Sequence, residues 1–350
     1  LLLGSGAAWA QVTGVSTSPE NKNAIVEEFS GVRCVNCPAG HTTLEQMATT
    51  FGNDFYVVTF MPNNSSYTSP YSGDPDLRRT YPAAYYATPY CGSSRFMPSA
   101  FINRREWSAN EKISSRSIWS ASAATIIAES SPMNVGILAN YNETTKMLTI
   151  TVESYYTANV SDQNTLYVTL AESGIFTQQS GASGSYEQKH VFREAFTAQW
   201  GDAVANTTMS SLNSNTYTFD NSTANYDMSK CDVLAYIENK TNEEIYTGMG
   251  ASVTTGAVAI DEKGVFSVDV FPNPFSNATA VTYVLSNTEA VSYQIVDLRG
   301  QEIVAVDLGT QSAGDHRIDI EAAKVGLSAG IYFIRLQAGE SAATKRLAVQ

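Results

Sequence analysis

The chain has 350 residues, of which only 16% are charged, and its formal net charge at pH 7 is −13. This length exceeds one ordinary core, so we expect two or three domains. The acidic balance, together with the lack of a basic or aromatic-basic run, argues against nucleic acid as a partner.

The first residues have the composition of an export signal. Residues 1–10 read as the end of a signal peptide, with Ala8-Trp9-Ala10 as a small-x-small cleavage site. No later run approaches about 18 continuous apolar residues, so no transmembrane helix is predicted. We therefore predict an exported protein that is soluble or anchored.

Residues 20–131 are predicted to form an α/β domain with an insertion at 61–96. A strand at 24–29 leads into a CxxC pair, Cys34 and Cys37, which opens a helix. Further along the chain we expect a strand at 55–60, a strand at 100–103 directly after Met97-Pro98, and a helix at 118–129.

The spacing of Cys34 and Cys37 allows a small disulfide ring at a helix start. Free amides and the helix dipole would stabilise Cys34 as a thiolate, which makes it the predicted nucleophile. We expect Cys34 to be the accessible sulfur, while Cys37, one turn into the helix, would be less accessible and would resolve a mixed disulfide. Arg33 could lower the thiol pKa further, because a nearby cation favours the charged form.

This order of strand, CxxC, helix and Met-Pro before a strand resembles the thioredoxin fold. The resemblance implies that Glu28 is a buried acid that takes the proton of the second cysteine. It also implies a cis Pro98, with Met97 beside the disulfide as part of a docking edge. The chain departs from thioredoxins at Arg33 and Asn36, where Trp and Pro are usual.

A plain alternative is that Cys34 and Cys37 form a permanent staple in an exported protein. The other two cysteines, Cys91 and Cys231, could bond to each other and tie the first domain to the second. They could equally remain buried free thiols, or Cys91 could exchange with the CxxC pair.

The insertion at 61–96 is rich in Pro, Tyr and Ser. Its tyrosines could recognise a partner, although a cap packed on its own aromatic rings is the favoured interpretation. Asp74 and Asp76 offer too few oxygens for calcium, so no metal or cofactor site is predicted.

Residues 132–255 change to alternating β-patterns and are predicted to form a β-sandwich of short strands. Strands are expected at 146–153, 165–170 and 231–238. His190 is interpreted as a domain-contact residue rather than a ligand, since no second His or paired Cys lies nearby. Residues 256–264 are a plausible linker.

The last part of the chain carries a set of landmarks in a fixed order. They are Phe271-Pro-Asn-Pro274, Val296-Asp-Leu-Arg-Gly300, Leu327-Ser-Ala-Gly330 and Lys345-Arg-Leu-Ala-Val-Gln350. Residues 265–350 thereby resemble the type A sorting domain of type IX secretion. This implies an immunoglobulin-like β-sandwich with the secretion machinery as its partner; a generic adhesive module is the alternative.

With that tail, the segment Glu27 to Pro38 and the stretch from His190 to Gly201 resemble the twenty-eight-kilodalton outer membrane protein family. The resemblance covers residues 20–255 and implies the outer membrane surface or the secreted fraction as the location. Two functions follow as hypotheses. One is thiol-disulfide exchange on an extracytoplasmic protein through Cys34, Cys37, Glu28 and Pro98, and the other is binding of a surface ligand by a disulfide-stapled platform.

Overall fold

The computed structural model divides into two compact units, Leu1–Gly256 and Ala257–Gln350. The structure describes residues 13–88, 90–92, 95–108, 111–255, 268–285, 287–297, 302–339 and 341–350. The expected signal-peptide end at 1–10 and the expected linker at 256–264 lie outside these residues. None of the helices within the described ranges is long and apolar enough to cross a membrane.

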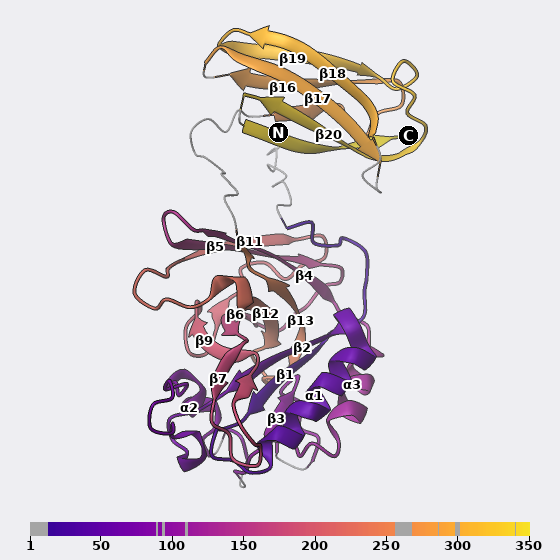
Figure 1. Ribbon diagram of the computed structural model, residues 1–350. Helices are drawn as coiled ribbons and strands as arrows, with labels where there is room; N and C mark the ends of the chain where they lie inside the picture. Colours follow the sequence, from indigo (N-terminus) through magenta and orange to yellow (C-terminus); the bar gives the residue numbers. More distant parts are fainter. Residues whose placement is uncertain are drawn as a thin grey trace. The chain divides into compact units, whose positions relative to one another are not determined.

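The first unit begins with a β-α-β arrangement. Strand β1 (Ala24–Phe29) pairs in parallel with β2 (Phe55–Phe60), and helix α1 (Cys37–Phe51) connects them. Strand β3 (Ser99–Ile102) pairs with β1 on its other side, antiparallel. Helices α1 and α3 (Trp119–Ile127) cover one face of these strands (Figure 1). The expected order of elements is therefore present.

The sheet continues beyond β2 into residues from the following part of the chain. Its order is β13-β12-β6-β9-β2-β1-β3, with β10 paired to β6. The strands that follow in the chain join β2 through a single parallel residue pair, Thr59 of β2 with Val191 of β9. The added strands are β6 (Asn164–Glu172), β9 (Val191–Ala195), β10 (Asp202–Ala203), β12 (Cys231–Asn239) and β13 (Ile245–Ser252).

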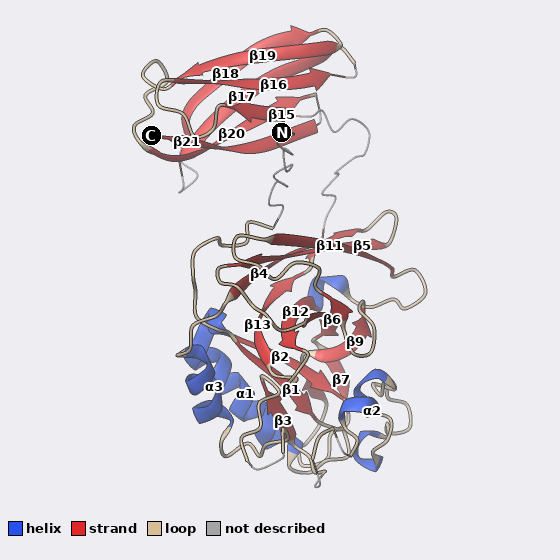
Figure 2. Ribbon diagram, turned by 180° about the vertical axis from the view of Figure 1, so that it is seen from behind, coloured by secondary structure: helices blue, strands red, loops and turns tan. Residues whose placement is uncertain are grey.

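A second, four-stranded sheet has the order β11-β5-β4-β14, and a core lies between it and strands β6 and β12. Its strands are β4 (Met133–Asn142), β5 (Met147–Tyr156), β11 (Leu212–Asp220) and β14 (Thr254–Thr255). A separate hairpin is formed by β7 (Ile175–Thr177) and β8 (Tyr186–Gln188). Figure 2 shows the two sheets and the helices from behind. The described part of the unit also contains short 3-10 helices: η1 (Gly52–Asp54), η2 (Ser66–Thr68) and η3 (Met228–Lys230).

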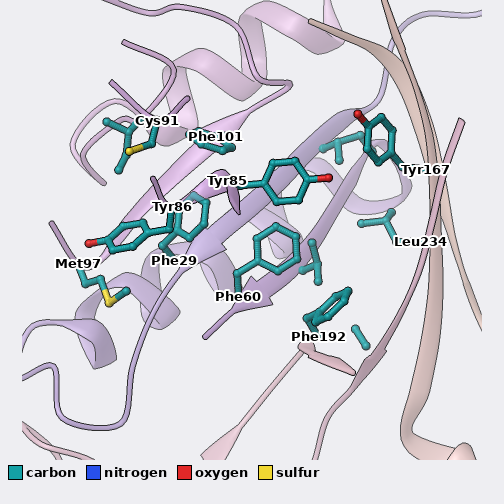
Figure 3. Packing of buried hydrophobic residues seen from close by; sticks show 14 of the residues in the cluster. Phe29, Phe60, Tyr85, Tyr86, Cys91, Met97, Phe101, Tyr167, Phe192 and Leu234 are labelled. Carbon is teal, nitrogen blue, oxygen red and sulfur yellow. The ribbon is translucent and has the colours of Figure 1, made fainter. Parts of the chain in front are cut away.

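The insertion, which contains α2 (Tyr81–Tyr85), packs on the opposite face of the large sheet. Tyr85 and Tyr86 are buried against Phe29 and Phe60 of the first strands (Figure 3). Tyr167 and Leu234 of β6 and β12 belong to the same core. These insertion tyrosines therefore form part of the core of the sheet, and the expected packing of the insertion on its own rings is limited to contacts such as those of Tyr85 with Tyr81 and Tyr90.

Beneath the insertion a buried arginine joins the two ends of the large sheet. Arg104 follows β3, and its guanidinium pairs with Glu27 of β1 and Glu238 of β12, each at 2.5 Å. It also lies 4.4 Å from the ring centroid of Tyr167 and 4.7 Å from that of Tyr85. A buried charge is costly unless it is paired in this way, so the network links β1 to β12 through Arg104.

The second unit consists of two antiparallel sheets that enclose one core. The orders are β15-β16-β19 and β18-β17-β20-β21. Ile334 and Leu336 of β20 are buried, as the alternation in this strand predicts. The strands are β15 (Val268–Phe271), β16 (Ala278–Leu285), β17 (Glu289–Asp297), β18 (Glu302–Gln311), β19 (Gly314–Glu321), β20 (Gly330–Ala338) and β21 (Ser341–Val349). Gly300, one of the landmarks, lies outside the described residues.

Candidate functional site

The CxxC pair lies at the start of α1 and is oxidised. Cys34 and Cys37 form a disulfide with their Cα atoms 5.4 Å apart. Pro38 occupies the first turn, where its missing N–H is tolerated, and Asn36 provides no side-chain cap. The local sequence thus places the pair at a helix N-terminus, as expected.

Both cysteines are buried, which differs from the expectation that Cys34 would be accessible. Cys34 is 2% exposed and Cys37 is fully buried, whereas the Val35 side chain between them is 64% exposed. Disulfide exchange needs access for an attacking thiolate. In this conformation the pair is shielded from such a partner.

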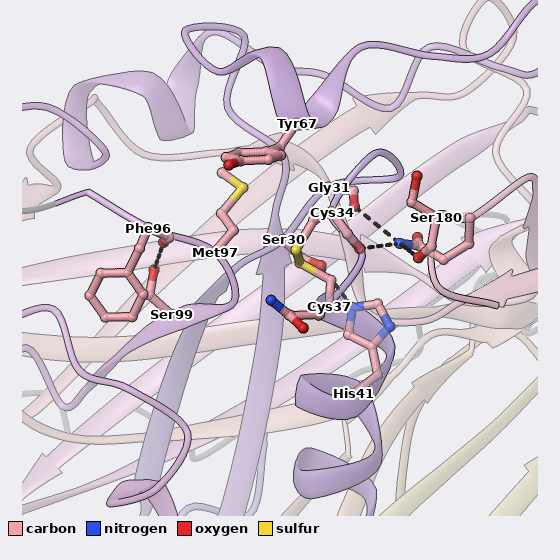
Figure 4. Close-up of a disulfide and its surroundings, with 12 residues drawn as sticks. Ser30, Gly31, Cys34, Cys37, His41, Tyr67, Phe96, Met97, Ser99 and Ser180 are labelled. Atoms are coloured by element: carbon pink, nitrogen blue, oxygen red, sulfur yellow. Dashed lines mark hydrogen bonds between the residues drawn. A yellow bond between two sulfur atoms is a disulfide. The ribbon is translucent and has the colours of Figure 1, made fainter.

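One segment packed beside the pair is the loop between β7 and β8, residues 178–185. The Gln179 side-chain amide donates to the carbonyl oxygens of Cys34 at 3.0 Å and Gly31 at 3.2 Å, and the Ser180 amide donates to Val32 at 2.8 Å (Figure 4). Gly181 has φ +83°, and a Cβ there would collide with the Val35 carbonyl oxygen. The loop therefore lies directly on the backbone of the CxxC segment.

Glu28 lies beneath α1 and is fully buried. Its Oε2 accepts a hydrogen bond from the Thr59 hydroxyl at 2.9 Å, while Oε1 lies 3.6 Å from His41 Nε2. Burial raises the pKa of this carboxyl above its usual range, and His41 and Thr59 offset that shift in part. Gly40 allows α1 to approach Glu28 closely, because a Cβ at this position would lie only 3.3 Å from Glu28 Oε1.

His41 is a site residue that the sequence did not single out. Its Nε2 is 2.8 Å from the Ser30 hydroxyl, and its Nδ1 is 2.7 Å from the Tyr186 hydroxyl of β8. The i, i+4 spacing from Cys37 puts His41 on the same helix face as that cysteine. That spacing is the signal that would have identified it.

The Met97–Pro98 peptide is cis, as the thioredoxin resemblance implied. Pro98 lies against the first turns of α1, since a Cβ on Gly40 would be 2.8 Å from its Cβ. Met97 is only 8% exposed, and its side chain extends toward Tyr67 in the view of Figure 4. Glu28 and Pro98, far apart in sequence, therefore both lie next to Gly40 beside the CxxC pair.

Arg33 is engaged by the insertion. Its guanidinium donates to the carbonyl oxygens of Ser69 and Pro70, both at 2.8 Å, and lies 4.2 Å from the Tyr71 ring centroid. These contacts hold the insertion against the CxxC segment. They give Arg33 a role in positioning this loop.

The bond considered between Cys91 and Cys231 is not formed. Both are buried free thiols, and each lies in a different core cluster. Burial raises the pKa of both thiols, which keeps them protonated and unreactive. The alternative of two buried free thiols is the one that the structure contains.

His190 joins the two parts of the large sheet through its backbone. Its carbonyl accepts a hydrogen bond from the Thr59 amide at 2.7 Å. Among the described residues no group of three or more His, Cys, Asp or Glu side chains could hold a metal ion.

Two family models match the chain. Residues 85–255 match the model described as outer membrane protein Omp28, and residues 269–350 match the secretion system C-terminal sorting domain. The chain contains an Omp28 domain and a C-terminal sorting domain. The sorting domain directs its carrier to type IX secretion, and the two domains together imply export to the outer membrane surface. The Omp28 match begins after Cys34 and Cys37, so it does not include the disulfide.

The chain is similar to proteins of known structure. HBP35 of Porphyromonas gingivalis matches with a TM-score of 0.56 and 14% identity, over 95% of this chain and 99% of that one. A domain of the outer membrane lipoprotein Omp28 from the same organism covers 36% of this chain and 92% of its own, with 18% identity and a TM-score of 0.28. No curated protein matches the chain. The similarity to HBP35 supports a multidomain chain with a mixed α/β first part and a β-sheet C-terminal part.

Proposed function

We propose that this exported surface protein is a binding protein built on a thioredoxin-like scaffold, in which the Cys34–Cys37 disulfide is a structural staple. In this proposal residues 20–131 are the thioredoxin-like domain, residues 132–255 a β-sandwich, and residues 265–350 an immunoglobulin-like sorting domain. The partner of the first two is an extracytoplasmic protein or surface ligand, and that of the last is the secretion machinery.

The burial of Cys34 carries the proposal. A catalytic disulfide must present one sulfur to a partner thiolate, whereas here Cys34 is 2% exposed and Cys37 is fully buried. The 178–185 loop is hydrogen-bonded to the backbone of the CxxC segment at several points, and Met97 belongs to the same buried cluster as both cysteines. A staple needs no such access.

The test is a redox titration of the full chain, read out by thiol alkylation. As a staple, the pair should resist reduction down to potentials below about −300 mV, the range of structural disulfides. Gln179→Ala should speed its reduction, because it removes the side-chain amide that bonds to Cys34 and Gly31. Gln178→Ala, at the exposed neighbouring position, should leave the rate unchanged.

A second candidate, thiol-disulfide exchange, is favoured by the placement of Glu28. A buried carboxyl with a raised pKa beside the α1 start is suited to accept a proton from Cys37, while Cys34 attacks and Pro98 with Met97 shapes the docking edge. In that case the pair should reduce reversibly between about −120 and −270 mV. Cys37→Ser should then trap mixed disulfides that Cys34→Ser does not. These two results together would contradict the proposal that the disulfide is only structural.

A further inference from the structure

A cavity of about 470 Å³ opens where the insertion meets the turn between β12 and β13. This volume lies within the range of about 300–1,000 Å³ that small-molecule sites occupy. Aromatic rings and polar groups share the lining, which includes Tyr90, Trp200, Thr88, Lys112, Lys240 and Glu243. Such a lining suits a ligand that has an apolar face and polar edges.

Trp200 forms an aromatic wall of this cavity. It is 42% exposed, although its ring centroid lies 5.2 Å from that of Tyr85 and 5.3 Å from that of Tyr90. The preceding residue is anchored, because the Gln199 carbonyl accepts from the Tyr85 hydroxyl and its side-chain amide donates to the Tyr81 carbonyl at 3.1 Å. A large ring that is exposed yet held in place loses little conformational freedom when a ligand stacks on it.

Most of the charged groups in the lining already have a partner. Glu238 pairs with Arg104 at 2.5 Å, and Lys112 pairs with Glu243 at 2.6 Å. Lys240 is exposed, and its ammonium group has no ion pair or hydrogen bond within the part of the chain that the structure describes. The cavity therefore offers an unpaired positive charge on a chain of formal net charge −13, which favours an anionic group on the ligand.

The other exposed polar groups of the lining favour a ligand with hydroxyl groups. Glu243 is partly exposed, and among the described residues only its Oε2 is engaged, by Lys112. Thr88 is also exposed and adds a hydroxyl group to the lining. A flat aromatic acid would displace water from Glu243 without supplying a donor, whereas a ring with hydroxyl groups replaces those hydrogen bonds.

We propose that this cavity binds an acidic sugar, with one face of the pyranose ring on the Trp200 indole and the carboxylate on the Lys240 ammonium group. The hydroxyl groups of the ring bond to Glu243 and Thr88. The C–H face of the sugar removes apolar indole surface from water, and the charge-assisted hydrogen bond to Lys240 selects the acidic form. The inference rests on the proposed binding function and gives it a ligand class, and it makes no use of the disulfide.

The test is calorimetry on the full chain with glucuronate as the probe, which should bind saturably. Glucose, the same ring without the carboxylate, should bind about fivefold more weakly, the size of one partly exposed ion pair. Benzoate, which has the carboxylate but no hydroxyl groups, should also bind more weakly than glucuronate. Added salt should weaken glucuronate and leave glucose unchanged, because screening acts on the charge.

Variants with matched controls locate the site. Lys240→Gln should weaken glucuronate about fivefold and leave glucose unchanged, whereas Lys230→Gln, at an exposed lysine outside the lining, should change neither. Trp200→Ala should abolish binding of both sugars, and Phe176→Ala, at an exposed ring outside the lining, should not. Thr88→Trp should block the cavity from an exposed position, so the test remains decisive if Trp200→Ala does not fold.

Three results would overturn the inference: no saturable glucuronate binding up to about 10 mM, equal binding of glucose or benzoate, or an affinity that Lys240→Gln and Thr88→Trp leave unchanged. None of them bears on the staple, which the redox titration tests separately. Conversely, a redox-active disulfide with intact glucuronate binding would contradict the staple and leave this site in place.

Discussion

At the scale of single residues, Glu28 is the position where folding and function oppose each other. An uncharged side chain would fit its buried place better, since burial disfavours the ionised form and raises the pKa of the carboxyl. The chain nevertheless retains a carboxyl group there, with one oxygen held by Thr59. A group kept at a cost to stability is a candidate for function.

Replacing Glu28 by Gln should therefore stabilise the protein at neutral pH, by about 1 kcal/mol, the usual size of a favourable single substitution. The pKa of Glu28 in the folded chain lies above its ordinary value of 4.5, so the natural chain loses stability as the pH rises from that value through the folded-state pKa. The gain from Gln should vanish below pH 4.5, where the carboxyl is protonated in the folded and the unfolded chain alike.

Denaturant unfolding of both chains across this pH range measures the effect. Thr59→Val serves as a comparison, because it removes the hydroxyl donor to Oε2 without changing the acid. If Glu28→Gln is less stable than the natural chain at pH 7, the carboxyl is compensated more fully than its burial indicates.

At the scale of elements, the large sheet depends on contacts between distant segments. Arg104 is the clearest case, because it joins Glu27 of β1 to Glu238 of β12 inside a cage of tyrosine rings. Neither carboxyl has a comparable cation elsewhere in the described network. Removing the guanidinium would leave two buried acids side by side.

Arg104→Met should consequently destabilise the first unit by about 3–5 kcal/mol at pH 7, the usual cost of breaking a buried ion pair. The loss should shrink as the pH falls, because burial raises the pKa of Glu238 and protonation removes its charge. Chemical denaturation at several pH values measures both effects.

Arg105→Met is the matched control. Arg105 pairs with Glu129 and Glu244 in a partly exposed setting, where an ion pair contributes about 0–1 kcal/mol. If both variants lose the same free energy of unfolding, the burial of Arg104 does not make its ion pairs more important for stability than those of Arg105.

The sequence predicted local elements well and long-range ones poorly. The strands at 24–29 and 55–60 have the predicted bounds, because their apolar runs are bounded by turn residues. The pairing of β2 with β9 rests on one residue pair, Thr59 with Val191. A single pair produces no recognisable residue pattern in either strand, so the sequence did not predict that β9 is the neighbour of β2.

The same limit applies to the candidate site. Cys34, Cys37, Glu28 and Pro98 were found because their order along the chain has a chemical meaning. The contact of Gln179 with the CxxC segment was not, since Gln179 lies 145 residues after Cys34 in a polar loop with no motif. The expectation that Cys34 is accessible was wrong, because the exposure of a short motif is decided by whatever packs on it.

At the scale of the whole molecule, the two compact units have separate cores. Val281, Ile295 and Ile334 from both sheets of the second unit pack with one another. A unit with its own core can fold and be removed without unfolding its neighbour.

Deleting residues 265–350 should therefore leave the first unit folded, with a thermal midpoint within a few degrees of the full chain, but retained in the periplasm. The sorting domain is the signal for type IX secretion, so its loss should abolish export to the surface without changing the stability of the first unit. Protease accessibility on intact cells, beside circular dichroism of the purified chain, measures both. A periplasmic passenger fused to residues 265–350 is the complementary control, and efficient surface display of the truncated chain would contradict the assignment.

The interleaved sheet also governs when this protein can acquire its structure. The core on Phe29 and Phe60 includes Tyr167, Leu234, Tyr236 and Ile245, so it is complete only after most of the first unit has been synthesised. Folds with such high contact order form slowly. A nascent chain of this kind stays unfolded for longer than one built from local contacts, which suits a protein that is exported to the outer membrane surface.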